Sequence, residues 1–329
     1  TFVVGAGKAA ASMARAVERH WPADAALAGL VVTRYAHGVP CTRIEVVEAG
    51  HPVPDAAGED AAARILAHAR ALDAEDLLLV LVSGGGSSLL SLPVDAVPMA
   101  ELKTVTRQLL ASGAPIQEIN VVRKHLSRIQ GGRLAQATRA TVHVLVVSDV
   151  AGDDLSAIAS GPCAPDPSTY RDALDVLARW GIVPPAGVAA HLARGAAGAV
   201  DETPKPGDAV FARVEHRMIA TAHASLDAAA RVFEAAGVRA VVLGDTITGE
   251  AREVAQVLGA IAREVATRER PFRRPVALIS GGECTVTVRG SGRGGRCAEF
   301  LLALVRALAD VPGVWALAAD TDGIDGIED

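Results

Sequence analysis

The sequence predicts an α/β protein with two α/β domains, a larger Rossmann-like doubly wound domain and a smaller C-terminal one. Short apolar runs alternate with longer helical patterns, which indicates parallel strands joined by helices. One run, Leu77–Val82, is apolar throughout, as in a strand buried on both faces of a parallel sheet. Residues 195–208 are rich in glycine, proline and charge, which indicates a linker. We therefore expect domains at residues 1–205 and 206–329.

The elements of the first domain follow from these patterns in chain order. β-branched and apolar runs predict strands, and alanine-rich amphipathic stretches between them predict helices. The strands are expected at 1–4, 30–33, 44–47, 77–82 and 142–147. The helices are expected from about residue 8 to 20 and at 56–72, 100–111, 168–180 and 187–194.

The second domain repeats the alternation. Its strands are expected at 217–221, 240–243, 276–279 and 314–318, and residues 283–289 alternate as in a half-exposed strand. Its helices are expected at 224–236, 248–268 and 297–309. Each half also places a Ser-Gly-Gly loop directly after an apolar strand.

Composition narrows the class of function. The net charge is −6 and only 3% of the residues are aromatic, which disfavours nucleic-acid binding. The four cysteines form no C-x-x-C pair, which favours reduced thiols in a cytoplasmic protein. No apolar run is long enough for a membrane span. The chain begins inside a strand without Met and stops just past a loop, so we expect a longer protein. The sequence does not determine the oligomeric state, so a homodimer is one of the alternatives.

Glycine-rich loops are the main functional signal. Gly5, Gly7 and Lys8 follow the first strand and precede a helix, an arrangement that can bring backbone N–H groups to a phosphate. A tight turn without a ligand is the alternative. The loop lacks the Walker A pattern, but it resembles part of a dinucleotide fingerprint, and Arg34 at the end of the second strand keeps an NADP interpretation open.

The second loop gives the stronger signal. Three consecutive glycines carry a large entropic cost, more than a simple turn requires. We therefore predict that it cradles phosphate or carboxylate groups. Its residues are Ser83, Gly84, Gly85, Gly86, Ser87 and Ser88. Further glycine loops lie at 280–283 and 289–296, the latter with three arginines suited to anionic oxygens.

Charged residues follow several strands. Asp149 lies just past a buried strand, where α/β sheets bind ligands. Asp320 and Asp322 lie close together after the last predicted strand and are candidates for Mg²⁺, although aspartates that stabilise a turn are an equal alternative. Arg123 and Lys124 are candidates for a substrate carboxylate, against the alternative of a solvated helix face.

Taken in order, the motifs resemble the glycerate 2-kinase family, whose members end in a MOFRL domain and some of which carry the older name hydroxypyruvate reductase. The motifs are GAGKAA, SGGGSS, NVVRKHLSRIQGGRLA, SDVAGDDLSAIASGP, SGGECTVTVRGSGRGGR and AADTDGIDG. The resemblance covers nearly the whole chain.

The resemblance implies ATP-dependent phosphorylation of D-glycerate to 2-phosphoglycerate with a divalent cation, in a cleft between the two domains. It places the family's functional lysine and arginine on Lys8 and Arg296 and its phosphate loop on 83–88. Glu283 joins Arg123 and Lys124 as an expected substrate contact. Asp149, Asp320 and Asp322 are candidates for binding Mg²⁺ or for orienting the glycerate hydroxyl.

The sequence departs from the family at Cys297 and Ala298, where the family has an Asn-Gln pair beside the arginine. Two other functions stay open: an NAD(P)H-dependent hydroxypyruvate reductase, and a ligand-binding protein without catalysis.

Overall fold

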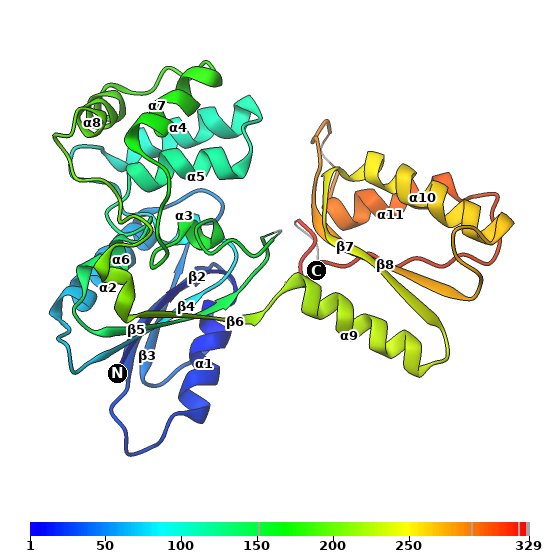
Figure 1. Cartoon of the computed structure of the whole chain (residues 1–329), viewed down its shortest axis with the longest axis horizontal. Helices are drawn as coiled ribbons and strands as arrows, with labels where there is room; N and C mark the ends of the chain where they lie inside the picture. Colours follow the sequence, from blue (N-terminus) through cyan, green and yellow to red (C-terminus); the bar gives the residue numbers. More distant parts are fainter. Residues whose placement is uncertain (151, 291, 322, 327–329) are drawn as a thin grey trace. The chain divides into compact units, whose positions relative to one another are not determined.

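The computed structural model describes residues 1–150, 152–290, 292–321 and 323–326. The chain forms two compact units (Figure 1). The first unit contains Thr1–Asp149 and Asp153–Ile219, and the second contains Val150–Gly152 and Ala220–Asp329. None of the helices in the described ranges combines the length and the apolar character that crossing a membrane requires.

The first unit is built on a six-stranded sheet. Its strand order is β3 (Ile44–Ala49), β2 (Ala28–Arg34), β1 (Phe2–Ala6), β4 (Leu77–Val82), β5 (Thr141–Val147) and β6 (Val214–Ala220). β1 pairs in parallel with both β2 and β4, so that Val4 lies opposite Leu30 on one side and Val80 on the other. The strand order therefore reverses between β1 and β4. In open α/β sheets, ligands bind at the carboxyl ends of the strands that flank such a reversal.

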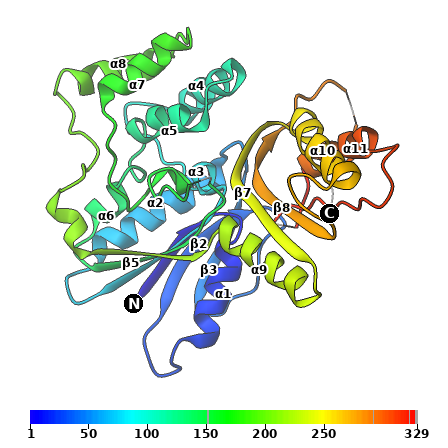
Figure 2. The same cartoon turned by 45° about the vertical axis from the view of Figure 1, so that its right-hand side comes forward.

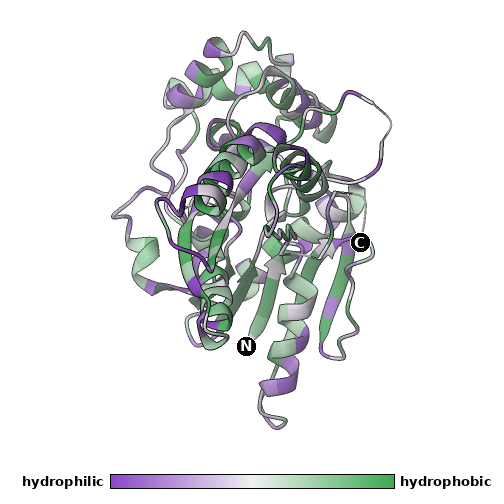
Figure 3. Ribbon diagram, turned by 90° about the vertical axis from the view of Figure 1, so that its right-hand side faces the viewer, coloured by the Kyte–Doolittle hydropathy of each residue, from purple (hydrophilic) through white to green (hydrophobic). Residues whose placement is uncertain are grey.

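The strands bury alternate residues on opposite faces of the sheet. Val3 and Leu81 pack with Met13 of α1 (Ala10–His20) on one face. Val4 and Val80 lie beside Ile65 of α2 (Ala56–Ala71) on the other face. This period of two follows from the pleat of a strand. The central strands β1 and β4 are covered on both faces, which is why they are apolar along their whole length, and Figure 3 shows the hydropathy of the chain.

Four helices form a second layer of the first unit, with a core of their own. They are α4 (Met99–Ser112), α5 (Ile116–His125), α7 (Tyr170–Arg179) and α8 (Ala186–Ala196), and they gather away from the sheet (Figure 1). Leu109, Val122, Tyr170 and Leu192 meet in this core. Four short helices complete the unit: α3 (Gly86–Leu89), η1 (Ile158–Ser160), α6 (Arg133–Ala137) and η2 (Ala209–Arg213).

The second unit has a small parallel sheet of β7 (Arg239–Glu250) and β8 (Val276–Thr285). α9 (Ala222–Ala235) packs on one side of it, and α10 (Ala251–Arg268) and α11 (Arg296–Ala307) lie side by side on the other (Figure 2). Ala255, Leu304, Leu308 and Val311 form its buried core.

Several predicted elements differ from the structure. Residues 248–250, predicted as the start of a helix, belong to β7. The strand predicted at 217–221 as the start of the second series is β6, which pairs as the edge of the large sheet. Residues 283–289 are a strand only to Thr285. Residues 314–318 form no strand, because they pair with neither strand of the small sheet, and Trp315 and Leu317 are each 89% exposed.

Candidate functional site

The loop after β1 uses its backbone N–H groups within the protein. The Lys8 amide donates to Gly84 O over 2.8 Å, and the Ala9 amide donates to Ser83 Oγ over 3.0 Å. Gly7 N–H donates to Val32 O, and Ala10 N–H donates to Gly7 O. These bonds hold the loop to β2 and to the loop after β4, and they occupy the donors that a phosphate would need.

Gly5 and Gly7 are therefore required for packing. Gly5 faces Leu81, and a side chain on Gly7, whose φ is +142°, would overlap Ser83. This geometry argues against their predicted role in phosphate binding. Lys8 also precedes α1 by two residues, so it does not lie in the first turn of the helix as expected.

In the loop after β4, by contrast, several backbone N–H groups are not bonded to any of the residues that the structure describes. Ser83 N–H is bonded to Ala6 O, and Gly86 N–H is bonded to Ser83 O. By contrast, within the described parts of the chain the N–H groups of Gly84, Gly85 and Ser87 have no hydrogen-bond partner. Gly85 has a φ of +80°, which bends the loop into α3. Successive open N–H groups in a bent loop form a nest for an anion.

Two predicted side chains reach this nest. The Asp149 carboxylate, which follows β5, lies directly against the Cα of Gly84, because an added methyl group there would overlap its oxygens. Cγ of Lys8 would lie 3.3 Å from a methyl group on Gly85. The structure thus brings together Lys8, Asp149 and the loop of residues 83–88, although they are widely separated in the sequence.

α5 is tied to the same loop by a chain of polar contacts. The buried Ser160 hydroxyl lies 2.8 Å from Ser87 Oγ and 3.2 Å from Oδ1 of the buried Asn120. Neither Asn120 nor Ser160 was predicted as part of a site. Their only sequence signal is their place in the motifs NVVRKHLSRIQGG and SAIASGP.

Arg123 lies one helical turn after Asn120, on the same face of α5. Its side chain is partly buried, and among the described residues it has no hydrogen bond or ion pair. Burial therefore acts alone and lowers the pKa of its guanidinium to about 10. An incompletely hydrated guanidinium without a counter-ion is a natural partner for a carboxylate or a phosphate.

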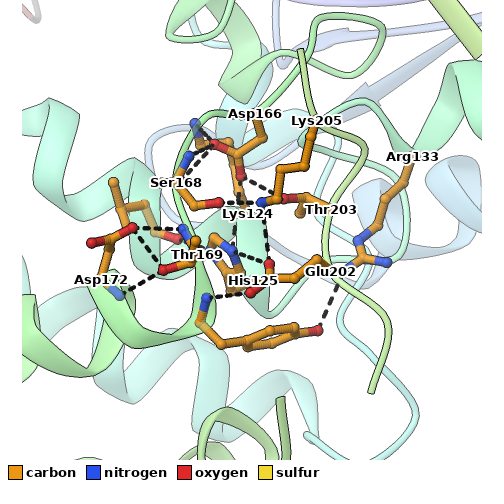
Figure 4. A network of polar contacts seen from close by, with 12 residues as sticks. Lys124, His125, Arg133, Asp166, Ser168, Thr169, Asp172, Glu202, Thr203 and Lys205 are labelled. Carbon is orange, nitrogen blue, oxygen red and sulfur yellow. Dashed lines mark hydrogen bonds and ion pairs between the residues drawn. The ribbon is translucent and has the colours of Figure 1, made fainter. Parts of the chain in front are cut away.

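Lys124, its neighbour, points into a buried network instead (Figure 4). Its ammonium lies 2.8 Å from the buried carboxylate of Asp166. Burial favours the neutral acid, but the charge of Lys124 and hydrogen bonds from Lys124 and Ser168 outweigh it, so the pKa of Asp166 is lowered. His125 and Thr203 also contact Asp166, which makes Lys124 part of the internal structure of the first unit.

In the second unit, Arg296 begins α11 and lies between two carboxylates. Its Nε and Nη2 donate to Asp320 Oδ2 over 3.0 and 2.6 Å, and Nη1 contacts Glu283. Burial disfavours the charged guanidinium, but Glu283 and Asp320 outweigh it and raise the pKa of Arg296. Three predicted site residues therefore form one ionic cluster.

Asp325 closes the start of the same helix. Its carboxylate accepts hydrogen bonds from the backbone N–H groups of Cys297 and Ala298 over 2.9 and 2.7 Å. Burial, Asp325 and Asp320 raise the pKa of the Cys297 thiol to about 11. Ligand atoms of Cys297, Asp320 and Asp325 lie within 4.8 Å of one another. However, a neutral thiol, a carboxylate paired with Arg296 and a helix cap do not make the oxygen site that Mg²⁺ prefers. Asp322 lies outside the described residues.

Two family models match the chain. Residues 1–193 match a domain of unknown function, DUF4147, and residues 276–329 match the MOFRL family.

Curated relatives match over nearly the whole chain. A protein of Agrobacterium vitis named "Putative hydroxypyruvate reductase" is 48% identical, over 99% of this chain and 73% of its own length. The "Glycerate 2-kinase" of Pyrococcus horikoshii is 42% identical, over 100% of this chain and 74% of its own. A crystal structure of glycerate kinase from Thermotoga maritima superposes with a TM-score of 0.86 at 41% identity, over 100% of this chain and 77% of that one.

Proposed function

This chain belongs to the glycerate 2-kinase family, and from that premise we propose that it transfers the γ-phosphoryl group of ATP to the C2 hydroxyl of D-glycerate. Its 42% identity to a glycerate 2-kinase along the full chain supports the activity. The open N–H groups of Gly84, Gly85 and Ser87 are the structural observation that carries the proposal, because they provide a built site for phosphate oxygens.

Two cations would neutralise the charge of the transferred group. Phosphoryl transfer depends on positioning and charge neutralisation more than on covalent chemistry. Lys8 lies at the nest in the first unit. Arg296 would come from the second unit, where Asp320 and Glu283 hold its guanidinium. We propose that Glu283 contacts the substrate through its place beside Arg296.

Arg123 is proposed to bind the glycerate carboxylate. Its side chain is partly buried and lacks a protein partner among the described residues. It lies on the helix face that Asn120 links to Ser87 through the hydroxyl of Ser160. Lys124 was an equal candidate in the sequence. Its ion pair with Asp166 leaves Arg123 as the better choice.

Asp149 is the residue we propose for Mg²⁺. Its carboxylate supplies the hard oxygen ligands that Mg²⁺ prefers, and it adjoins Gly84 at the nest where the nucleotide phosphates would lie. A bound Mg²⁺ would neutralise charge on those phosphates. Asp320 fits this role less well, because Arg296 occupies it.

The reductase alternative is favoured by the name of the Agrobacterium vitis relative. The loop after β1 speaks against it. A dinucleotide fingerprint presents the N–H groups of that loop to the pyrophosphate, whereas here Gly7, Lys8 and Ala9 donate to protein oxygens.

A direct assay separates the two activities. The protein is incubated with D-glycerate, ATP and Mg²⁺, and the product is identified by phosphorus NMR. We expect 2-phosphoglycerate, and 3-phosphoglycerate would correct the assignment of the hydroxyl. NADPH absorbance is followed in parallel with hydroxypyruvate. Oxidation of NADPH without phosphorylation would overturn the kinase in favour of the reductase, and tight binding of ATP without turnover would favour a non-catalytic protein.

We also propose that the protein acts in the cytoplasm, because Cys41, Cys163, Cys284 and Cys297 are all free thiols. Measurement of its mass in solution by light scattering decides whether it is a homodimer.

A further inference from the structure

We propose that His51 is a further residue of the phosphoryl site, donating a ring N–H to a phosphate oxygen held by the nest at residues 84–87. This inference rests on the proposed function of that nest. His51 follows β3 by two residues, at the same edge of the sheet as Lys8 and Asp149. A methyl group built on Gly85 would lie 2.9 Å from His51 Nε2 and 3.3 Å from Lys8 Cγ. The imidazole and the stem of the lysine therefore border the same glycine.

The loop that carries His51 is anchored by one carboxylate. Asp55 is the N-cap of α2 and accepts the Gly58 N–H over 3.0 Å. It also accepts the hydroxyl of Tyr35, just after β2, over 2.7 Å, and the backbone N–H of Gly50. Asp55 thus joins the end of β2, the start of α2 and the residue before His51. The backbone that carries His51 is thereby anchored to two other elements of the first unit.

The chemistry of the surroundings suits a hydrogen-bond donor at this point. Asp149 lies against Gly84, and Lys8 and His51 border Gly85. A phosphate in the nest would accept hydrogen bonds from the backbone N–H groups, and the stem of the Lys8 side chain borders the same loop. A directed imidazole N–H would add a donor whose strength grows as negative charge develops on the transferred group.

The test compares four variants for ATP binding by calorimetry and for phosphorylation of D-glycerate. His51→Ala should weaken ATP binding about 10-fold, as expected for losing one hydrogen bond to a charged group. It should lower kcat by about 10²–10³-fold, with KM for D-glycerate nearly unchanged. His51→Gln keeps an N–H donor and should recover much of both losses. His51→Phe fills the space without a donor and should recover neither. His20→Gln changes an exposed histidine at the end of α1 and should match the parent.

The pattern across the variants decides the proposal. Full activity of His51→Phe would show that the ring only packs on Gly85 and would overturn it. If His51→Gln is as inactive as His51→Ala, an N–H donor at this position is not sufficient. His51 would then act by accepting a proton, and the proposed role as a donor would be overturned. If the parent binds ATP but does not phosphorylate D-glycerate, the proposed substrate is wrong, and the binding constants alone still decide the role of His51.

Discussion

Two adjacent cations on α5 have opposite environments. Lys124 is buried and paired with Asp166, whereas Arg123 is partly buried with no partner among the described residues. The sequence identified both as candidates for a carboxylate but could not separate them. The difference depends on Asp166, which lies about 40 positions further along the chain and folds against Lys124.

Substitution of Arg123 tests its role in substrate binding. We expect Arg123→Ala to raise KM for D-glycerate about 10–100-fold, the range for losing a hydrogen-bonded charge pair. Arg123→Lys keeps the charge but loses the planar fork and should recover only part of the affinity. Steady-state kinetics measure both effects. Arg107→Ala, at an exposed position of α4, is the control. An unchanged KM in Arg123→Ala would remove the residue from the site.

At the scale of the element, most strands and long helices could be predicted. β4 has the predicted bounds, and α2 and β3 differ by one or two residues, because continuous apolar runs and amphipathic periods are local signals. The short helix α3 was missed, since it depends on the turn at Gly85. Whether residues 314–318 form a strand depends on a pairing partner that is distant in the sequence, and so does the sheet that β6 joins. The local sequence pattern does not contain this information.

The Lys124–Asp166 ion pair should contribute strongly to the free energy of unfolding of the helical layer. Lys124→Met leaves the Asp166 carboxylate buried without its counter-ion, and we expect a loss of about 3–5 kcal/mol in the free energy of unfolding. Lys124→Met/Asp166→Leu should recover much of it. Urea denaturation measures these differences.

The exposed pair of Arg179 on α7 and Glu118 on α5 gives the control. Arg179→Met should cost less than about 1 kcal/mol, because surface ion pairs contribute little. A similar small loss in Lys124→Met would show that the buried pair is not a structural anchor.

His191 on α8 should make this layer sensitive to acid. Burial, followed by the Arg133 and Arg194 guanidiniums, lowers its pKa below the ordinary 6.5 in the folded protein. Below pH 6.5 the unfolded chain therefore binds more protons than the folded protein. As the pH is lowered from 6.5, the free energy of unfolding should decrease by at most about 1.4 kcal/mol per pH unit for one proton.

Urea denaturation at several pH values tests this slope. His191→Gln should make it shallower, while the lowered pKa of the nearby His125 preserves part of it. The exposed His20→Gln should keep the slope of the parent. An equal slope in His191→Gln and the parent would assign the acid sensitivity elsewhere.

At the scale of the whole molecule, each unit holds its own group of proposed site residues. The Lys8 side chain and the nest belong to the first unit, and the cluster of Arg296, Asp320 and Glu283 belongs to the second. The ordered motifs in the sequence identified both groups. They could not show that the N–H groups around Gly7 are used internally, because those bonds join three different loops and strands. The two-domain division with a boundary near residue 205 stays a proposal, and β6 belongs to the large sheet.

Substitution of Lys8 and Arg296, singly and together, tests whether both cations act on the same transferred group. Lys8→Ala and Arg296→Ala should each lower kcat by about 10³-fold or more, the scale of a charge-neutralising arginine in phosphoryl transfer. The double variant should lose much less than the product of the two, because groups that act as a unit are not additive. Near-normal turnover in both single variants would refute the assignment, and strictly multiplicative losses would mean independent roles.

The guanidinium of Arg123, which has no partner among the residues that the structure describes, also has a consequence for the resting protein. A charge that is partly removed from water without a counter-ion opposes folding until a ligand arrives. Any anion that fits should therefore raise the melting temperature, and sulfate or phosphate in a buffer should compete with the substrate. Removal of the charge in Arg123→Ala should make the ligand-free protein melt higher than the parent while abolishing this protection. A melting series with different small hydroxy acids would then rank the substrates before any turnover is measured.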